Sequence, residues 1–440
     1  MNGVGQAWLT RLRKPCAVLA FAVAASVSLP AQEIAPEVRL LSRIRDHQRE
    51  ELSHLPDYTC TETIRRFRKG AKPNDVLKPF DTVRLEVLFA EGHELYGAPG
   101  ARRFTTDPSQ FVGSGLIGTG IFATWLRTLF IDNYAVFTWR GEEQIAGQRS
   151  VRWDFRVPMM YSGYTITVAG ISGKSGFKGS FWADPETLDL LQLVVDAEDI
   201  AFGVPAMEVN NSVTYARMLV GDRAALLPQT AIMRLLPMTF EEERNYLEFT
   251  HCQAFHAESS LSFGPPSDSA SAQGPKFAVA AAPVQALPAG LVVTLALVTP
   301  IGGKDLVGSP ISARVLAPVR HKGRVTIAEG AIVHGRIRRL EHYEDQGGYF
   351  VVGLEFTDVE PGGFTFYADL QEVETSAGAE RELRKSTTER TVVRNGWQEK
   401  TTTNHIWIYD LPGVGTFFVR GNRLNLPAGL KTVWKTVNGR

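Results

Sequence analysis

The sequence predicts a mainly β protein: an antiparallel half-barrel with a few helices, followed by a second, smaller β-barrel domain. Short runs of alternating apolar and polar residues recur along most of the chain, as is typical of half-buried antiparallel strands. Residues 264–286, rich in Pro, Ser, Ala and Gly, divide these runs into two blocks and are predicted to be a linker. Two segments, 37–54 and 115–130, show helical periodicity.

Residues 1–31 are predicted to be a secretory signal peptide. Arg11, Arg13 and Lys14 precede the apolar run CAVLAFAVAASVSL, and small residues lie before a cleavage site after Ala31. A membrane anchor is the alternative, but the run is shorter than the about 20 residues needed to cross a bilayer. Later runs are too short or too polar to span a membrane as a helix. We therefore expect an exported protein, periplasmic or associated with the outer membrane, without a transmembrane helix after cleavage.

The composition indicates a folded protein without a nucleic-acid partner. Lys plus Arg and Asp plus Glu each number 47, and 44% of the residues are apolar. Loss of the three basic residues of the signal peptide leaves a net charge of about −3, whereas nucleic-acid binding requires a basic stripe. The mature chain of about 409 residues is long enough for two domains.

Cys60 and Cys252 are predicted to form a disulfide. Cleavage removes the third cysteine, Cys16, and two cysteines in an exported chain most simply pair with each other. Closing so long a loop contributes about 5 kcal/mol in the chain-entropy model. Metal binding is the alternative, because His251 and His256 flank Cys252, but a fourth ligand with recognisable spacing is missing. We expect no metal site.

The first block, residues 32–263, begins with an amphipathic helix and continues as a meander of strands. The helix at 37–54 carries its apolar residues on one face, namely Val38, Leu41, Ile44 and Leu52. The clearest alternation lies in TVRLEVLF (82–89) and SVRWDFRV (150–157), and WADPETLDLL predicts two strands joined by a tight Asp-Pro turn. Further strands are predicted at AVFTWR, YTITVAG, GSFWAD, LLQLVV, NNSVTYARM, QTAIMRLL and NYLEFTHC.

The second block, residues 287–440, is also rich in predicted strands. The pentapeptide LPAGL occurs at 287–291 and again at 426–430. Because the two copies bracket this block, we expect its ends to lie side by side and to close a barrel. The polar and charged segment 375–404 is predicted to be a long exposed hairpin or loop.

Residues 113–118 read Gly-Ser-Gly-Leu-Ile-Gly, which matches the G-x-G-x-x-G fingerprint of dinucleotide-binding proteins. That fingerprint needs a βαβ unit and an acidic residue on the second strand. Here the sequence DNYAVFTWRGEEQ follows and leads into an antiparallel hairpin. The similar SGKSG at 172–176 has Val168 where a phosphate-binding loop needs glycine. We therefore expect no nucleotide cofactor, and no other cofactor is predicted.

The segment 115–130 is predicted to be one amphipathic helix of about four turns. Its apolar face is formed by Ile117, Ile121, Phe122, Trp125, Leu126, Leu129 and Phe130. Two interpretations stay open. The helix could pack permanently onto the concave side of the sheet, or it could be a movable plug over an apolar cavity, with glycines loosening its start.

The chain carries no recognisable catalytic motif. G-x-S-x-G and H-E-x-x-H are both missing, and the nine histidines are scattered. The acidic group Asp196, Glu198 and Asp199 could bind a cation, but such a group more often ends a strand in solvent. Carboxylate pairs can hydrolyse glycosides, yet sequence alone does not pair them. We predict no enzyme activity and no catalytic residues.

Residues 37–262 resemble the periplasmic lipoprotein-carrier family. The matching stretches are the opening helix, the strand TVRLEVLF and the segment GSFWADPETLDLLQLVV, which is similar to the family's strand–turn–strand pattern. The resemblance implies a curved half-barrel whose apolar concave side is plugged by helices and holds an apolar cargo. Because the family's cargo contacts have no fixed motif, only candidates for the ligand cavity carry over: Ile121, Phe122, Trp125, Leu126 and Leu129.

Residues 287–437 look like the C-terminal β-barrel of TrbI-type conjugative transfer proteins. The pattern stands here as Leu287-Pro288-Ala289-Gly290, Leu297 to Ile301, Gly308, Ala313, Val315, Gly323, Ile327, Gly330 and Gly335. The resemblance implies a barrel within a cell-envelope complex. Because the segment 375–404 is too polar to span a membrane, we expect contacts with envelope proteins and not a pore.

These observations predict a non-enzymatic envelope protein. Its first domain would bind a lipid, an acyl chain or another apolar ligand, and its second domain would bind envelope proteins. A purely structural or assembly component of an envelope complex is one alternative, and a hydrolase without a recognisable motif is another.

Overall fold

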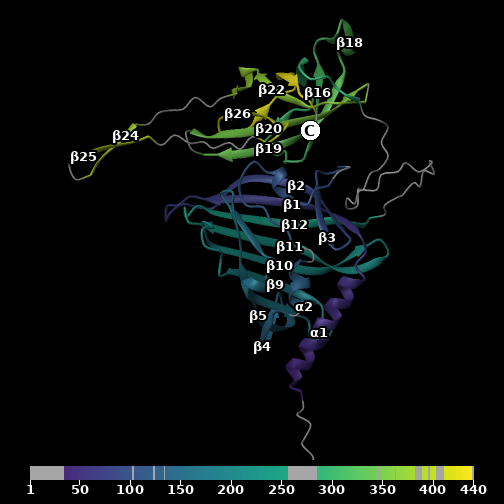
Figure 1. Ribbon diagram of the computed structural model, residues 1–440, viewed down its shortest axis with the longest axis vertical. Coiled ribbons are helices and arrows are strands. Elements are labelled where there is room, and N and C mark those ends of the chain that lie inside the picture. Colours follow the sequence, from purple (N-terminus) through teal and green to yellow (C-terminus); the bar gives the residue numbers. More distant parts are fainter. Residues whose placement is uncertain are drawn as a thin grey trace, which may run out of the picture.

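The structure is a computed structural model that describes residues 34–101, 104–121, 124–132, 134–255, 285–344, 347–361, 363–381, 389–394, 397–402 and 411–438. The predicted signal peptide and nearly all of the predicted linker lie outside these residues. Two large β-sheets follow each other along the chain (Figure 1), which confirms the mainly β fold class. Within the described residues, none of the helices has the length and apolar character needed to cross a membrane.

The chain begins with helix α1 (Pro36–Ser53), close to the expected helix at 37–54. Proline in the first turn suits a helix start, because its missing N–H would have no partner there. Ile44 and Gln48 are buried, and the Gln48 amide donates to the carbonyl of Leu188 at 3.0 Å. These contacts fix α1 against the turn that joins two strands of the first sheet.

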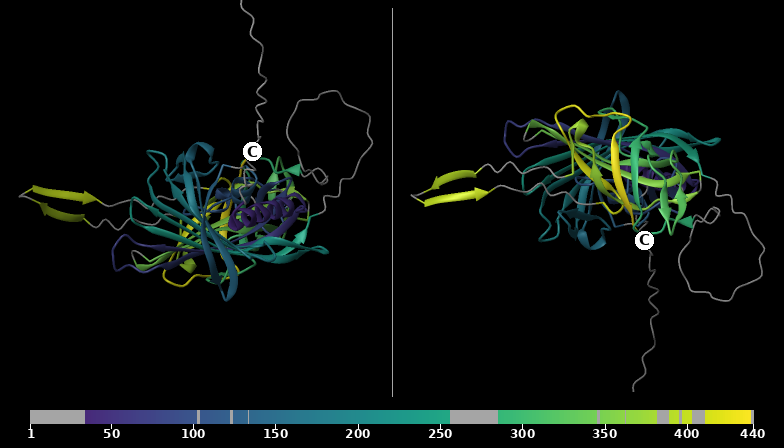
Figure 2. Two further views of the ribbon diagram at one scale, coloured as in Figure 1. Left: turned by 90° about the horizontal axis from the view of Figure 1, so that it is seen from below. Right: turned by 90° about the horizontal axis from the view of Figure 1, so that it is seen from above.

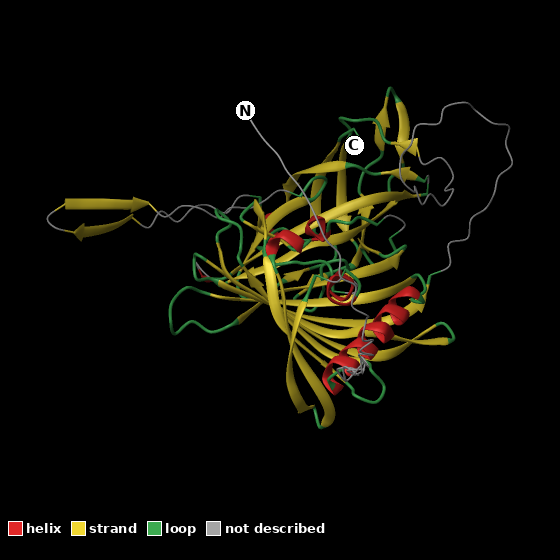
Figure 3. Ribbon diagram, turned by 60° about the horizontal axis from the view of Figure 1, so that its bottom comes forward, coloured by secondary structure: helices red, strands yellow, loops and turns green. Residues whose placement is uncertain are grey.

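The first sheet has ten antiparallel strands in the order β3-β2-β1-β12-β11-β10-β9-β8-β5-β4. The strands are β1 (Tyr58–Lys69), β2 (Lys78–Ala90), β3 (His93–Gly97), β4 (Val136–Ile145), β5 (Gln148–Val157), β8 (Gly176–Ala183), β9 (Leu190–Glu198), β10 (Ala206–Val220), β11 (Arg223–Pro237) and β12 (Glu242–Ala254). The sheet curves strongly, with the helices on one side of it (Figure 3). Its connections contain η1 (Pro108–Phe111), α2 (Thr124–Phe130), η2 (Met159–Tyr161) and the hairpin of β6 (Thr165–Val168) and β7 (Ile171–Lys174).

The predicted alternation corresponds to the observed burial. In β2 the apolar residues of TVRLEVLF are buried, and SVRWDFRV forms most of β5. The Asp-Pro turn joins β8 to β9, where the amide of Asp184 donates to the carbonyl of Asp189 at 2.9 Å. One face of the sheet is therefore apolar and lies against the helices, as expected for a half-barrel.

The predicted disulfide is present and joins Cys60 of β1 to Cys252 of β12. These two strands are neighbours although the cysteines are 192 residues apart in sequence. The pairing register shifts between Thr59 and Thr61, and His251 has a φ of +52° on the partner strand. The bond therefore closes the meander where its first and last long strands meet.

The second sheet is nearly closed on itself. Its strand order is β13-β21-β20-β19-β16-β14-β28-β22, and β26 pairs with both β20 and β23. The strands are β13 (Gln285–Ala286), β14 (Val292–Leu297), β16 (Pro310–Val315), β19 (Ile332–Tyr343), β20 (Tyr349–Glu360), β21 (Phe364–Thr365), β22 (Ala368–Val373), β23 (Ala379–Glu380), β26 (Gly415–Arg420) and β28 (Lys431–Thr436).

Smaller elements complete this part of the chain. They are the pairs β15 (Ile301–Gly302) with β27 (Asn425–Leu426), β17 (Val319–His321) with β18 (Arg324–Ile327), and β24 (Glu389–Arg394) with β25 (Trp397–Thr402), together with η4 (Thr375–Ala377). The β24–β25 hairpin falls within the polar segment 375–404 and stands away from both sheets (Figures 1 and 2).

The two LPAGL copies form equivalent turns. Each precedes one of two neighbouring antiparallel strands, β14 and β28, so the ends of this block lie side by side as expected. Gly290 has a φ of +88° and Gly429 a φ of +91°, a conformation that glycine adopts without steric cost. The repeat therefore has a structural reason, because the same turn directly precedes each of the two strands.

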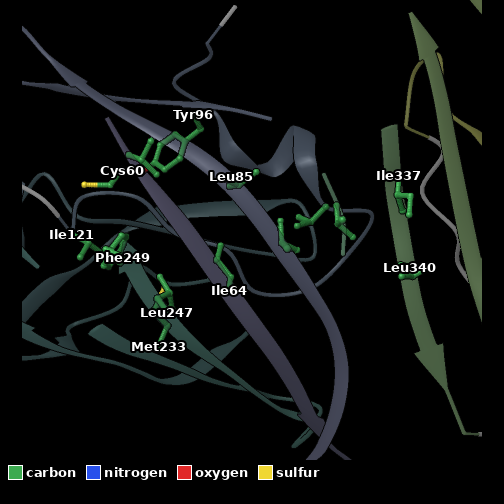
Figure 4. Close-up of a cluster of buried hydrophobic side chains, with 14 of the residues drawn as sticks. Cys60, Ile64, Leu85, Tyr96, Ile121, Met233, Leu247, Phe249, Ile337 and Leu340 are labelled. Carbon is green, nitrogen blue, oxygen red and sulfur yellow. The ribbon is translucent and has the colours of Figure 1, made fainter. Parts of the chain in front are cut away.

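The two sheets are joined by backbone hydrogen bonds. Val307 exchanges hydrogen bonds of 2.9 Å with Thr82 and Arg84 at the free edge of β2. The next residue, Gly308, donates to the carbonyl of Ile337 on β19 at 2.8 Å. The buried apolar cluster likewise includes residues of both sheets, such as Leu85 and Ile337 (Figure 4). The segment around Val307 and Gly308 thus lies between β2 of the first sheet and β19 of the second and is hydrogen-bonded to both.

Candidate functional site

Helix α2 is much shorter than the sequence predicts. A helix over 115–130 was expected, but the described helix is the seven-residue segment Thr124–Phe130. The expectation is wrong for the preceding part, because Gly115 has a φ of +90° and Gly120 a φ of +93°. These values lie in the left-handed region, which interrupts a right-handed helix.

The described ligand-cavity candidates are all buried in one apolar cluster. The exposed fractions are 4% for Ile121, 5% for Trp125, 3% for Leu126 and 0% for Leu129, whereas Phe122 lies outside the described residues. Figure 4 draws Ile121 and Phe249 of β12 as members of the same buried cluster. In this conformation, α2 and the residues before it fill the concave side of the sheet.

Aromatic contacts seat α2 on the sheet. The ring of Trp125 lies 4.7 Å from Tyr164 and 5.0 Å from Phe177, in edge-to-face geometry in both cases. Phe130 makes the same kind of contact with Phe181 at 5.3 Å. Such pairs stabilise by about 0.5–1.5 kcal/mol each beyond the burial of their area.

The chain before α2 crosses the apolar face of the sheet as an irregular segment, residues 108–121, here called the strap. Its described backbone hydrogen bonds to other backbone groups are all local. Side chains of the sheet hold it instead: Asn245 donates to the carbonyl of Leu116 at 2.7 Å, and the Gly120 amide donates to Glu94 at 2.7 Å. The strap and α2 are therefore attached to the sheet without being part of its hydrogen-bonded ladder.

The G-x-G-x-x-G motif belongs to the strap, and its glycines permit close contacts. A Cβ on Gly113 would overlap the guanidinium of Arg339 on β19 and lie 2.5 Å from an oxygen of Glu341. A Cβ on Gly115 would lie 2.8 Å from the guanidinium of Arg68 on β1. The glycines of the motif therefore allow the strap to pack closely against β19 and β1. They do not precede a helix whose N-terminus could bind a phosphate.

Two buried ion pairs lie under the strap. Arg66 and Asp81 pair through two hydrogen bonds, and Arg339 pairs with Glu341 at 2.9 Å. Burial raises the pKa of the Asp81 carboxyl, although the Arg66 charge acts in the opposite direction. Arg66 also donates to the carbonyl of Ser114. The first pair belongs to the first sheet and the second to β19, so the strap contacts a buried charge pair of each sheet.

A second polar group on the buried face was not identified from the sequence. Glu62 lies on β1 in phase with Cys60 and Ile64, and it faces Leu85 and Phe249 on the neighbouring strands. Its side chain is buried, and this burial together with the charge of Glu94 raises its pKa to about 8. The alternation of TCTETIRRF was a usable signal, because it places Glu62 among buried residues.

Two surface hollows lie away from the α2 candidates. One, of about 550 Å³, lies between α1 and Ile131, and the other, of about 530 Å³, lies over β4, β5 and β8. Neither is lined by the described ligand-cavity candidates. The acidic group of the sequence analysis lies near the second hollow, where Glu198 pairs with Arg156 and Lys178. Among the described residues, no group of three His, Cys, Asp or Glu side chains could hold a metal ion.

Comparison with known proteins gives little beyond this geometry. The chain matches no protein-family model and no curated protein. One similar solved structure is a domain from Vibrio parahaemolyticus described as an outer membrane lipoprotein-sorting protein, with 15% identity, a TM-score of 0.28, and coverage of 50% of this chain and 94% of that chain. A DUF1329 family protein from Desulfovibrio piger has 11% identity, a TM-score of 0.25, and coverage of 51% and 95%.

Each of these two structures matches about half of this chain. A TrbI-type domain is not among them, so that resemblance stays an expectation. Likeness at this level assigns no ligand, partner or activity to the chain.

Proposed function

We propose that this chain is an exported envelope protein that binds the apolar chain of an amphiphile on the concave side of the first sheet, in the space that α2 fills here. The second sheet would contact envelope proteins. The observation that carries the proposal is the attachment of α2. Apolar side chains pack it onto the sheet, glycines with a positive φ precede it, and backbone ladder bonds to the sheet are missing from its described residues.

The energies of the exchange are of comparable size. Four buried side chains of α2, namely Trp125, Leu126, Leu129 and Phe130, stabilise its seat by about 6–12 kcal/mol at the usual value for each side chain. An acyl chain contributes about 0.8 kcal/mol for each buried methylene. A chain of about ten methylenes would therefore replace most of the burial that α2 gives up, while the sheet keeps its hydrogen bonds.

The disulfide supports an exported location. Disulfides persist in oxidising compartments such as the bacterial periplasm, and Cys60 and Cys252 form one across neighbouring strands. The predicted signal peptide at 1–31 gives the same expectation from the sequence.

A purely structural role is the second candidate. It is favoured by the complete burial of Leu129 and Phe130, and by the hydrogen-bonded junction of the two sheets through Val307. In that case α2 would be ordinary core and would never leave the sheet. The two candidates therefore differ in one measurable property, which is competition between α2 and an apolar ligand.

That competition can be measured by calorimetric titration of the mature protein with 1-decanol. Trp125→Ala should weaken the seat of α2 and tighten decanol binding about tenfold or more, because such a truncation removes about 3–5 kcal/mol of packing. Trp434→Ala is the matched control, since Trp434 is 1% exposed and lies in the second sheet. Its decanol affinity should equal that of the wild type. Equal or weaker binding by Trp125→Ala, or no binding by any of the three proteins, would overturn the proposal.

A further inference from the structure

Two carboxyl groups and three phenols gather on the buried face of the first sheet, beside the end of the strap. They are Glu62 and Tyr58 of β1, Glu94 and Tyr96 of β3, and Tyr215 of β10, here called the carboxyl–tyrosine cluster. Tyr96 donates to Glu94 at 2.7 Å. The Glu94 charge raises the pKa of each of the other four groups, for all of which burial is the largest cause. Glu94 is therefore the one charged group that raises the pKa of all four others.

Two polar atoms of this cluster have no hydrogen-bond partner within the part of the chain that the structure describes. They are Oε2 of Glu62 and the hydroxyl oxygen of Tyr215. The two residues are 3% and 6% exposed. A buried polar atom without a partner is costly, and proteins keep such atoms mainly where they serve a function. Both atoms therefore indicate a group that binds here when α2 is displaced.

The group that now contacts Glu94 from the strap is itself an N–H donor. Gly120 donates its amide to Oε2 of Glu94 at 2.7 Å, and Tyr96 donates its hydroxyl to the same oxygen. Gly120 precedes α2 by a few residues, so displacing α2 draws this amide away. A ligand that takes the place of α2 can donate to Glu94 where the Gly120 amide does now, beside the Tyr96 hydroxyl.

The negative charge of Glu94 favours a positively charged hydrogen-bond donor. Arg66, on the same face of β1, is committed to Asp81 and to the carbonyl of Ser114. Arg127 is part of α2 and leaves with it. The displaced state thus has one buried carboxyl group, Glu62, one half-buried carboxyl group, Glu94, and the aromatic rings of the three tyrosines. Aromatic faces attract cations. An anionic headgroup would be repelled by Glu94.

We propose that the carboxyl–tyrosine cluster binds the ammonium group of an amphiphile whose apolar chain replaces α2. This inference rests on the proposed function and adds the chemical class of its ligand. Glu94 takes one N–H of the ammonium group in place of the Gly120 amide, and Glu62 and the Tyr215 hydroxyl accept the others.

The test compares decylamine with 1-decanol, which share one apolar chain and differ in the headgroup, by calorimetric titration of the mature protein at pH 7. Hydrogen bonds to charged groups are the stronger ones, so decylamine should bind about tenfold to a hundredfold more tightly than decanol. Because Glu94 carries the negative charge that faces the ammonium group, Glu94→Gln should remove most of this preference, and Tyr215→Phe should reduce it. Glu241→Gln, at an exposed site outside the cluster, is the control and should keep it.

The outcomes separate the two proposals. Equal binding of decylamine and decanol would overturn the ammonium site and leave the apolar site standing. A full preference that survives Glu94→Gln would also overturn it, because nonspecific attraction of the amine would then explain the difference. If neither probe binds, the proposed function fails and this inference fails with it.

Discussion

Replacing Gly113 by alanine tests how the strap is seated between the two sheets. A Cβ at this position would overlap the guanidinium of Arg339 and lie 2.5 Å from Oε1 of Glu341. These partners are 1% and 0% exposed and hydrogen-bonded to each other, so neither can swing into solvent. Either the strap must lift from β19 or the ion pair must separate.

The size of the effect follows from these two routes. Forcing an extra methyl group into a packed interior costs about 1–3 kcal/mol. Separating a fully buried ion pair costs about 3–5 kcal/mol. Because the chain takes the cheaper route, Gly113→Ala should lower the free energy of unfolding by about 1–3 kcal/mol.

Urea denaturation followed by circular dichroism measures this change, with Gly163→Ala as the matched control. Gly163 has no other atom within 4 Å of its added Cβ, so alanine there should change stability by less than about 0.5 kcal/mol. If the two variants unfold at the same urea concentration, the strap does not rest on Arg339 and Glu341, and the structural explanation of the glycine motif is refuted.

Three further predictions concern other parts of the molecule. Gly308→Ala should split the calorimetric unfolding transition in two, because its Cβ would lie 2.5 Å from a β2 carbonyl at the sheet junction. Gly290→Ala is the control: Gly290 has a similar positive φ but open space around its added Cβ, so the transition should stay undivided. The pKa of the Glu62 carboxyl is raised from 4.5 to about 8, so the native state should lose up to about 5 kcal/mol of stability as pH rises from about 4.5 to 8. Glu62→Gln should flatten this dependence of stability on pH. An unchanged slope would contradict the burial of this carboxyl. Thiol labelling of the native mature protein should find Cys60 and Cys252 unreactive until they are reduced, and one or two labelled thiols before reduction would contradict the disulfide.

The sequence predicts the strands well because alternation is a local property. TVRLEVLF can bury its apolar residues against one layer only if it is extended, whatever the rest of the chain does. The repeated LPAGL was equally informative, since glycine at the fourth position allows the same turn before β14 and before β28. The disulfide followed from the number of cysteines and the expected compartment.

The features that position the candidate site were harder to predict. The period of apolar residues over 115–130 is helical, but Gly115 and Gly120 have a positive φ and lie against groups far away in sequence, Arg68 on β1 and Glu94 on β3. Val307 joins the sheets through its backbone groups, so the type of residue at this position does not predict the contact. The burial of Glu62 could have been predicted, because it lies two residues from both Cys60 and Ile64 and therefore on the same face of the strand. A charged residue in a strand is, however, ordinarily taken to face solvent.

Strand pairing and ligand exchange depend on different parts of this molecule. The ladder from β3 to β4, the disulfide and the Val307 junction hold the sheets together through bonds in which the described strap residues and α2 take no part. The strap is held by side chains such as Asn245 and Glu94, and α2 by its apolar packing. Removing α2 from the concave face therefore costs buried area and a few hydrogen bonds, but leaves every strand paired. Variants of the strap and of α2 should therefore alter ligand affinity as well as the free energy of unfolding, whereas variants of the junction should alter the unfolding transition alone.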